Sequence, residues 1–233
     1  MALAAVAAFA GAVVQSASGL GFALVLSPVL FVVLEPAEAV TAVLLLGAAL
    51  CALVLVESRG VATHGLARVL LPALPGLGLG VVVLAALSKE PLQVGVGVAV
   101  VVAAGWQLRH PAPIRYPVWV AGVLSGALTT SIGVNGPPLA LWLESEDVPP
   151  REFRTTLAAA FLILDILGVG AIVSSEGLEA VDLGRLAPLL ACVGAGYGVG
   201  AVAFRRLDAE RFSAVVLSVV VCTGLASVVA GIL

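Results

Sequence analysis

The chain has 233 residues, of which 61% are hydrophobic and only 11% are charged, and its formal net charge is −3. A soluble domain carries about a quarter charged residues, so the composition excludes an ordinary soluble protein and places most of the chain in lipid. No basic tail or basic–aromatic patch occurs in the sequence, so nothing indicates a nucleic-acid partner.

The first apolar stretch, about residues 2–34, is too long for one membrane helix and is interrupted at its centre by small polar residues and glycine. The interruption reads Gln15-Ser16-Ala17-Ser18-Gly19-Leu20-Gly21. A bilayer core about 30 Å thick needs roughly 20 helical residues. Broken polar backbone at membrane depth persists only where it is buried in protein or lines a cavity. The stretch is therefore predicted to form two half-helices around a functional break.

Six unbroken apolar runs, each near the length of a transmembrane helix, and a second broken stretch make up the rest of the chain. Three runs cover about 39–56, 66–87 and 92–108. The second broken stretch, about 118–143, then carries Thr129-Thr130-Ser131-Ile132-Gly133-Val134-Asn135-Gly136-Pro137-Pro138. The last three runs cover about 157–173, 183–204 and 212–233. We predict one all-α polytopic membrane domain over residues 1–233.

The chain repeats itself about half-way along. Pro36-Ala37-Glu38-Ala39-Val40-Thr41 aligns with Pro150-Arg151-Glu152-Phe153-Arg154-Thr155, and Gly76-x-Gly78-x-Gly80 aligns with Gly196-x-Gly198-x-Gly200. Residues 1–110 and 117–233 are therefore two copies of one unit, each a broken segment followed by three plain helices. The glycines lie inside apolar spans and predict close helix packing. The sequence leaves open whether that packing is within one protomer or between two copies in a homodimer.

The positive charges of the loops decide how the two copies are oriented. If each broken segment crosses the membrane once, the Lys and Arg residues divide almost evenly between the two sides. If each is a hairpin that enters and leaves on one face, only Lys89 and Arg185 oppose all the others. That asymmetry is a strong positive-inside signal. The hairpin arrangement predicts two inverted repeats with both termini outside, and inverted repeats place substrate at their interface. The sequence leaves open whether these re-entrant-type hairpins turn back within the membrane or span a thinned region of it.

The two hairpin tips are the candidate binding site. Helix breaks free backbone N–H groups, and the N-termini of half-helices carry partial positive charge, which together favour an anion. The alternative is that these residues only cap and pack broken helices, because Ser and Thr often bond their own backbone. The candidate substrate-binding residues are Gln15, Ser16, Ser18, Gly19, Gly21, Thr130, Ser131, Asn135, Gly136 and Pro137.

Asp165 is the one acidic residue well inside a predicted span. An intramembrane carboxyl by default marks a pathway or proton relay, and the alternative is a protonated Asp bonded to a neighbouring helix. The first repeat has no acid at the matching place, near Ala49 or Leu50, so proton coupling through Asp165 would be one-sided. No Arg or Lys lies deep inside a predicted span, since Arg68 and Arg185 fall within the first three residues of theirs. At most, an entrance is guarded by Arg68, Arg151 or Arg154.

The sequence predicts no enzyme, cofactor or metal site. Cys51, Cys192 and Cys222 fall singly in three different apolar runs, and we interpret them as small buried side chains. An intramembrane enzyme would need a nucleophile with a base, or paired carboxylates, at span depth. Asp165 is alone there, and no Lys or His accompanies it.

At the two hairpins the sequence resembles the sulfite exporter TauE/SafE family, also called the TSUP permeases. The resemblance extends over essentially the whole chain, including its duplicated layout. In the first half it rests on Gln15-Ser16-Ala17-Ser18-Gly19-Leu20-Gly21-Phe22-Ala23-Leu24-Val25-Leu26-Ser27-Pro28. In the second half it rests on Gly133-Val134-Asn135-Gly136-Pro137-Pro138-Leu139-Ala140-Leu141-Trp142-Leu143 and Phe153-Arg154-Thr155-Thr156-Leu157.

The resemblance implies a secondary transporter, an exporter of small sulfur-containing anions such as sulfite or organosulfonates across the bacterial inner membrane. It points to Gly19, Gly21, Asn135, Gly136 and Pro137 at the hairpin tips. Members with a similar second-half motif often carry Asn at the position of Asp165. We expect alternating access, with the anion held between the two tips. A proton-coupled uptake permease, or a channel for another small anion, is the alternative.

Overall fold

The computed structural model describes residues 1–58, 63–109, 115–177 and 183–204. Within these ranges the chain forms nine helices and no strand, so the predicted all-α class is confirmed there. The predicted span at 212–233 lies outside the described residues, as do four of the predicted loop arginines: Arg59, Arg205, Arg206 and Arg211.

The first predicted break separates two short helices, α1 (Ala2–Ser18) and α2 (Phe22–Val33). Gly19 and Gly21 lie in the turn with φ of 82° and 124°, a region that side chains disfavour and glycine tolerates. Met1, at the start of α1, and Leu34, just after α2, line the same surface pocket. The two helices therefore form a hairpin whose ends lie on one face of the molecule.

The second predicted break separates α6 (Val118–Ile132) from α7 (Gly136–Ser145). Gly133 ends α6 with φ of 72°, and prolines occupy the first turn of α7, where the missing N–H costs nothing. At about 1.5 Å per residue, the 15 residues of α6 and the 10 of α7 fall short of a bilayer core. Both hairpins are thus built from half-helices.

The remaining five helices are long. They are α3 (Pro36–Glu57), α4 (Leu66–Ala86), α5 (Lys89–Arg109), α8 (Pro150–Glu176) and α9 (Leu183–Phe204). Proline occupies the first turn of α3 and of α8. Four of the described helices, α3, α4, α8 and α9, are long and apolar enough to cross a membrane. Several such helices in one chain are what a multi-pass membrane protein requires.

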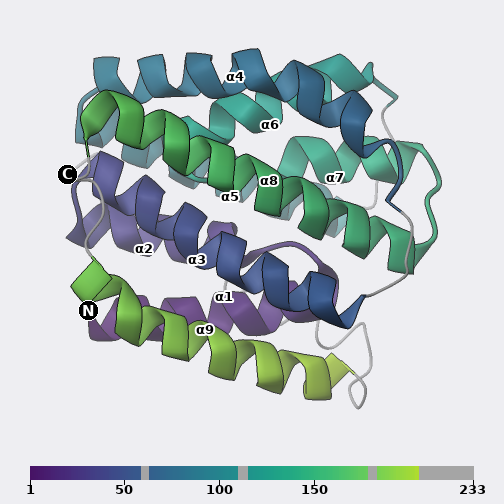
Figure 1. Cartoon of the computed structure of the whole chain (residues 1–233), viewed down its shortest axis with the longest axis horizontal. Coiled ribbons are helices and arrows are strands. Elements are labelled where there is room, and N and C mark those ends of the chain that lie inside the picture. Colours follow the sequence, from purple (N-terminus) through teal and green to yellow (C-terminus); the bar gives the residue numbers. More distant parts are fainter. Residues whose placement is uncertain (59–62, 110–114, 178–182, 205–233) are drawn as a thin grey trace.

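The helices of the two halves interlock (Figure 1). α4 of the first half packs along α6 of the second, α9 of the second packs along α1 of the first, and α3 and α8 lie together between these pairs. Each outer pair thus combines a long helix of one half with the first helix of the other half's hairpin. Each hairpin therefore has a packing partner from the other half as well as from its own.

The aligned glycines allow this close approach. A Cβ atom at Gly76 or Gly80 would collide with backbone of α6, at the carbonyl oxygens of Val123 and Ala127. A Cβ atom at Gly196 would collide with α1 in the same way, at the Phe9 carbonyl oxygen. Small residues let helix backbones meet where lipid gives no hydrophobic drive for association.

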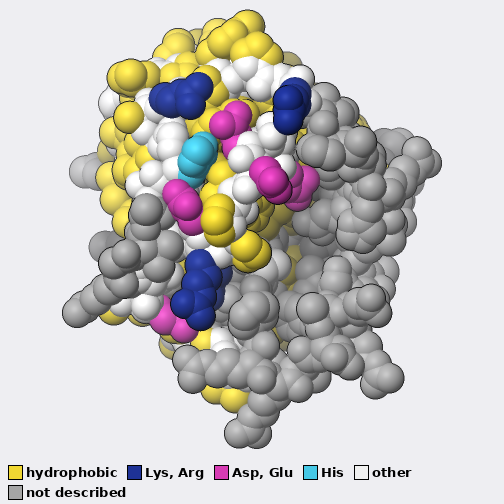
Figure 2. All heavy atoms as spheres, turned by 90° about the vertical axis from the view of Figure 1, so that its right-hand side faces the viewer, with side chains coloured by type: hydrophobic (Ala, Val, Ile, Leu, Met, Phe, Trp, Pro, Cys, Tyr) yellow, Lys and Arg dark blue, Asp and Glu magenta, His cyan; other side chains and the backbone are white. Residues whose placement is uncertain are grey.

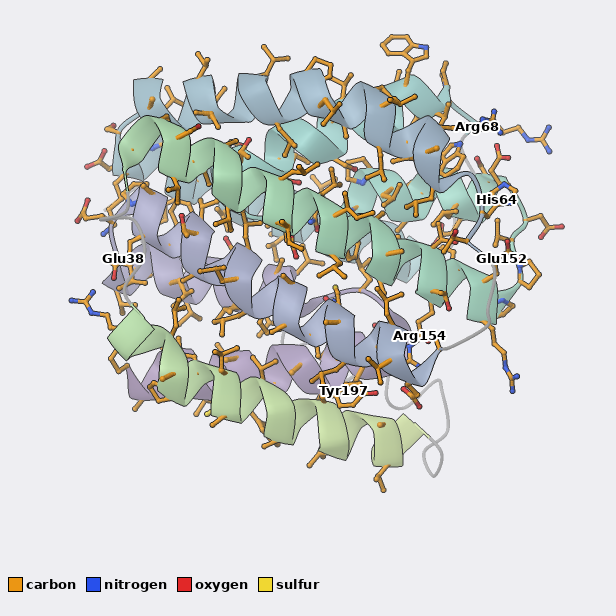
Figure 3. The ribbon with its side chains drawn as sticks, in the orientation of Figure 1. Glu38, His64, Arg68, Glu152, Arg154 and Tyr197 are labelled. Carbon is orange, nitrogen blue, oxygen red and sulfur yellow. The ribbon has the colours of Figure 1, made fainter. Side chains whose placement is uncertain are left out.

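Charged side chains gather at the two ends of the bundle. Arg68, His64 and Arg154 lie at one end and Glu38 at the other (Figure 3). Seen end-on, the first of these faces carries basic, acidic and His side chains among hydrophobic ones (Figure 2). The sides between the two ends expose large apolar residues such as Leu71 and Trp119, as lipid contact requires.

Gly80→Ala tests the helix packing, and Gly78→Ala is its matched control. A Cβ atom at position 80 collides with α6, whereas one at position 78 meets nothing within 4 Å. We expect Gly80→Ala to lower the free energy of unfolding by about 1–3 kcal/mol and Gly78→Ala to leave it unchanged or raise it by up to about 1 kcal/mol. Denaturation in detergent micelles measures both. Equal stabilities of the two variants would contradict the packing.

Candidate functional site

The two hairpin tips contact each other inside the bundle. Ser27 of α2 donates a hydrogen bond from its Oγ to the carbonyl oxygen of Ile132, the last residue of α6, over 2.7 Å. The turn of the second hairpin packs on that of the first, because a Cβ atom at Gly136 would collide with the side chain of Leu20. Residues far apart in sequence therefore form one central site.

A small cavity lies at this meeting point, with a volume of about 10 Å³, room for about one water molecule. Its walls come from both hairpins and from the two central helices, α3 and α8. Four polar side chains reach it: Gln15, Cys51, Asn135 and Asp165. The apolar part of the wall is formed by Phe22, Ala23, Val43 and Phe161, and two glycines complete it: Gly47 and Gly133.

Asn135 joins the second hairpin to α8. It is the N-cap residue of α7, yet its side chain makes no capping hydrogen bond. Instead its Nδ2 donates to Oδ1 of Asp165 at 2.9 Å, and both side chains are buried, 5% and 4% exposed. A buried carboxyl is costly without a partner, so Asn135 stabilises Asp165 at the cavity.

Gln15 performs a similar task in the first hairpin. Its Oε1 accepts a hydrogen bond from the backbone N–H of Phe22 over 3.2 Å, which satisfies one of the free donors at the start of α2. Its Nε2 donates to Sγ of Cys51 on α3, 3.3 Å away. One amide thus braces the hairpin turn and connects it to α3.

Cys51 and Asp165 occupy equivalent places in the two halves. Pro36 begins α3 and Pro150 begins α8, and each cavity residue follows its proline at the same interval along the helix. Position 51, rather than 49 or 50, is therefore the counterpart of Asp165. Sequence reasoning treated Cys51 as a plain buried side chain, and aligning the two helix starts would have placed it in the site.

The remaining predicted binding residues lie in the hairpins but turn away from the cavity. Ser16 and Ser131 donate to carbonyl oxygens of their own helices over 3.0 and 2.7 Å. Ser18 and Thr130 likewise donate to backbone carbonyls, as such side chains often do. The other predicted residues lie in the two turns or the first turn of α7: Gly19, Gly21, Gly136 and Pro137.

Helix ends add partial charges to this site. α2 and α7 both begin at the cavity, where Phe22 and Asn135 line it, so the positive ends of two helix dipoles face it. α1 and α6 end there, and their last carbonyls are bonded within the turns, for example Gln15 O by the Gly19 N–H and Thr129 O by the Gly133 N–H. These helix dipoles therefore favour an anion, whereas the Asp165 carboxyl in the same cavity opposes one when it is ionised.

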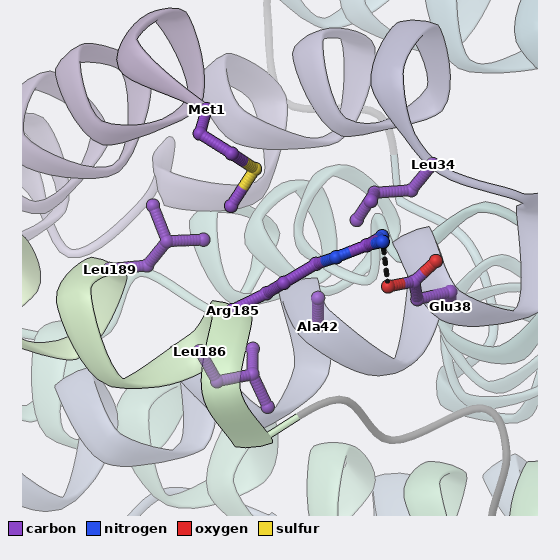
Figure 4. A pocket seen from close by; sticks show the side chains of 7 residues that line it. All are labelled: Met1, Leu34, Glu38, Ala42, Arg185, Leu186 and Leu189. Carbon is purple, nitrogen blue, oxygen red and sulfur yellow. Dashed lines mark hydrogen bonds and ion pairs between the residues drawn. The ribbon is translucent and has the colours of Figure 1, made fainter.

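An ion pair lies at the end of the bundle where the first hairpin begins and ends (Figure 4). Nη1 of Arg185 on α9 donates to Oε1 of Glu38 on α3 over 2.8 Å. Met1 and Leu34, the two ends of the first hairpin, line the same pocket. The hairpin, α3 and α9 are thus held together at this face.

The comparison with known families fits this arrangement. The family model described as "Sulfite exporter TauE/SafE" matches residues 3–227. The chain belongs to the TauE/SafE family. No curated protein and no solved structure shows a significant match to it. Membership of TauE/SafE confirms the predicted resemblance and makes this chain a member of a family of membrane exporters of sulfite, in line with a transporter rather than an enzyme.

The hydrogen bond between Asn135 and Asp165 predicts energetic coupling in this TauE/SafE protein. We expect Asn135→Ala to lower the free energy of unfolding by about 1–3 kcal/mol, because a buried carboxyl loses its donor. Ser131→Ala, whose hydroxyl bonds its own helix, is the control and should change it by less than about 0.5 kcal/mol.

A double-mutant cycle over Asn135→Ala and Asp165→Ala isolates the interaction energy between the two side chains from the effect of each single substitution on stability. Denaturation of the four proteins in micelles gives the coupling, expected at about 1 kcal/mol or more. Strictly additive effects would show that the two side chains do not interact.

Proposed function

We propose that this chain is a secondary transporter that exports small sulfur-containing anions, such as sulfite or organosulfonates, by alternating access. The observation that carries the proposal is the shared cavity, into which each hairpin places one amide side chain, Gln15 or Asn135. Two helix N-termini face the same space. The family match supports sulfite or a related anion as substrate.

We further propose that residues 1–110 and 117–233 are inverted repeats, with both termini outside the bacterial inner membrane. The reciprocal packing of α4 on α6 and of α9 on α1 supports this, because a two-fold axis in the membrane plane would exchange the two pairs. The end of the bundle that bears Arg68, His64 and Arg154 is then cytoplasmic, in keeping with the positive-inside rule.

Movement of the tips is part of the proposed cycle. The cavity of about 10 Å³ has room for about one water, so a sulfur oxyanion enters only when the tips or the central helices separate. Opening alternately toward each face would expose the same amides to each side in turn, which is the alternating-access scheme of inverted-repeat transporters.

The membrane potential alone can drive export of an anion. Moving one negative charge outward across an inside-negative membrane releases about 2.3 kcal/mol per 100 mV, so export needs no coupling ion. Uptake would need a proton or another cation. The presence of the Asp165 carboxyl in the cavity favours one alternative, a proton-coupled uptake permease, which we retain as the second candidate function.

Flux of sulfite through proteoliposomes distinguishes these functions. Under an imposed potential and without a pH gradient, we expect efflux by the unmodified protein and by Ser131→Ala. Efflux should fall about tenfold in Asn135→Ala, the equivalent of about 1.4 kcal/mol in anion binding. Asp165→Asn should retain potential-driven efflux, because an uncoupled exporter carries no proton.

Three results would contradict the exporter. Flux that requires a pH gradient and is abolished by Asp165→Asn would establish the proton-coupled permease. Flux without counterflow, at rates of ion conduction, would establish a channel. No flux of sulfite or of any sulfonate would remove sulfur anions as substrates.

A further inference from the structure

Arg154 lies over the tip of the first hairpin. It belongs to the first turns of α8, and a Cβ atom at Gly19 would lie 3.3 Å from its Cγ and 3.5 Å from its Cα. The N–H of Gly19 bonds the carbonyl oxygen of Gln15 over 2.8 Å, and Gln15 lines the cavity. One helical turn therefore separates the contact of Arg154 from the central site.

The guanidinium of Arg154 is held by an acid on another helix. Its Nη2 donates to Oε2 of Glu57, the last residue of α3, over 3.2 Å. The Tyr197 hydroxyl on α9 donates to the same carboxylate oxygen over 3.0 Å. These two bonds join α8, α3 and α9, and Figure 3 labels Arg154 and Tyr197. The Glu57 side chain is 37% exposed, so water reaches the Arg154–Glu57 ion pair. A solvent-exposed ion pair is weak, and another anion can replace Glu57 in it.

One donor of Arg154 has no acceptor among the residues that the structure describes. Its Nε is buried and makes no hydrogen bond to the described part of the chain. Buried donors are nearly always bonded, and an Arg fork presents Nε–H and Nη–H side by side in the spacing that suits two oxygens of one oxyanion. Glu57 accepts from Nη2, whereas Nε stays without an acceptor within the described ranges, so the bidentate position of the fork is incomplete there.

We infer that Arg154 binds the transported oxyanion at the cytoplasmic entrance and that Glu57 competes with the anion for its guanidinium. The inference rests on the proposed function and adds an entry site to it. An arriving anion accepts hydrogen bonds from Nε and Nη2 and displaces Glu57, which keeps its bond to Tyr197. The Arg154–Glu57 ion pair between α8 and α3 is then broken next to Gly19. Binding of the anion thus removes a contact that holds the hairpin tip, and this tip must move to admit the anion.

Opposite effects of two neutral substitutions test this competition. In inside-out membrane vesicles, which present the cytoplasmic face outward, we expect Arg154→Gln to raise the half-saturating sulfite concentration about tenfold by removing the charged fork. Glu57→Gln removes the competitor and should lower it about threefold. Arg154→Lys should lie between wild type and Arg154→Gln, because it keeps the charge without the fork.

Lys89→Gln is the matched control, since it also removes the cation of a surface ion pair, the one with Glu35 over 3.7 Å, and its half-saturation should equal that of wild type. If the ion pair is purely structural, Arg154→Gln and Glu57→Gln should have the same effect: a lower maximal rate of transport with an unchanged half-saturating sulfite concentration. That result would overturn the inference. If Arg154→Gln does not fold, Glu57→Gln decides: a half-saturation that does not fall overturns it. Absence of sulfite flux in the unmodified protein would overturn the proposed function itself and this inference with it.

Discussion

A backbone N–H or carbonyl group that leaves a helix at membrane depth has no water to bond, so the protein must supply its partner. This chain breaks a helix in each half and meets the requirement locally. Gln15 accepts from the N–H of Phe22 across the first break, and at the second break the N–H groups of Gly133 and Val134 bond carbonyls of α6. The same side chains and turns that satisfy the backbone are those that line the cavity.

Enclosing the breaks requires helices to come close, which explains the glycine repeats. α4 approaches α6 through Gly76 and Gly80, and α9 approaches α1 through Gly196 and Gly200. This proximity also supplies a partner for a buried hydroxyl, because Thr130 of α6 donates to the Leu77 carbonyl of α4 over 2.7 Å. Each half thus packs a long helix along the first helix of the other half's hairpin.

Much of this architecture was predictable because glycine and proline, which restrict the backbone conformations available to the chain, occupy the helix breaks and helix starts. Glycines with positive φ and the proline pair marked both breaks, and Pro36 and Pro150 marked the starts of α3 and α8. The direction of each hydroxyl was not predictable, since a Ser or Thr beside a break can bond its own helix or face the cavity with little difference in energy. The pairing of Arg154 with Glu57 was equally hidden, because it joins residues 97 positions apart.

The equivalent positions of Cys51 and Asp165 make the two halves of the site chemically different. A carboxylate about 4 Å from an anion would repel it by about 4 kcal/mol at an effective dielectric constant of 20, more than the roughly 2.3 kcal/mol that export gains from 100 mV. Asn135 bonds only Oδ1 of Asp165, and one amide hydrogen bond offsets a fraction of that repulsion. In the proposed exporter, an anion at the tips would require Asp165 to carry a proton or turn away, and export would stay uncoupled only if that proton did not cross with the anion. Cys51 would impose no such condition on the other half. Under the proposed function, asymmetry at this one pair of positions would decide whether the site accepts an anion alone or together with a proton.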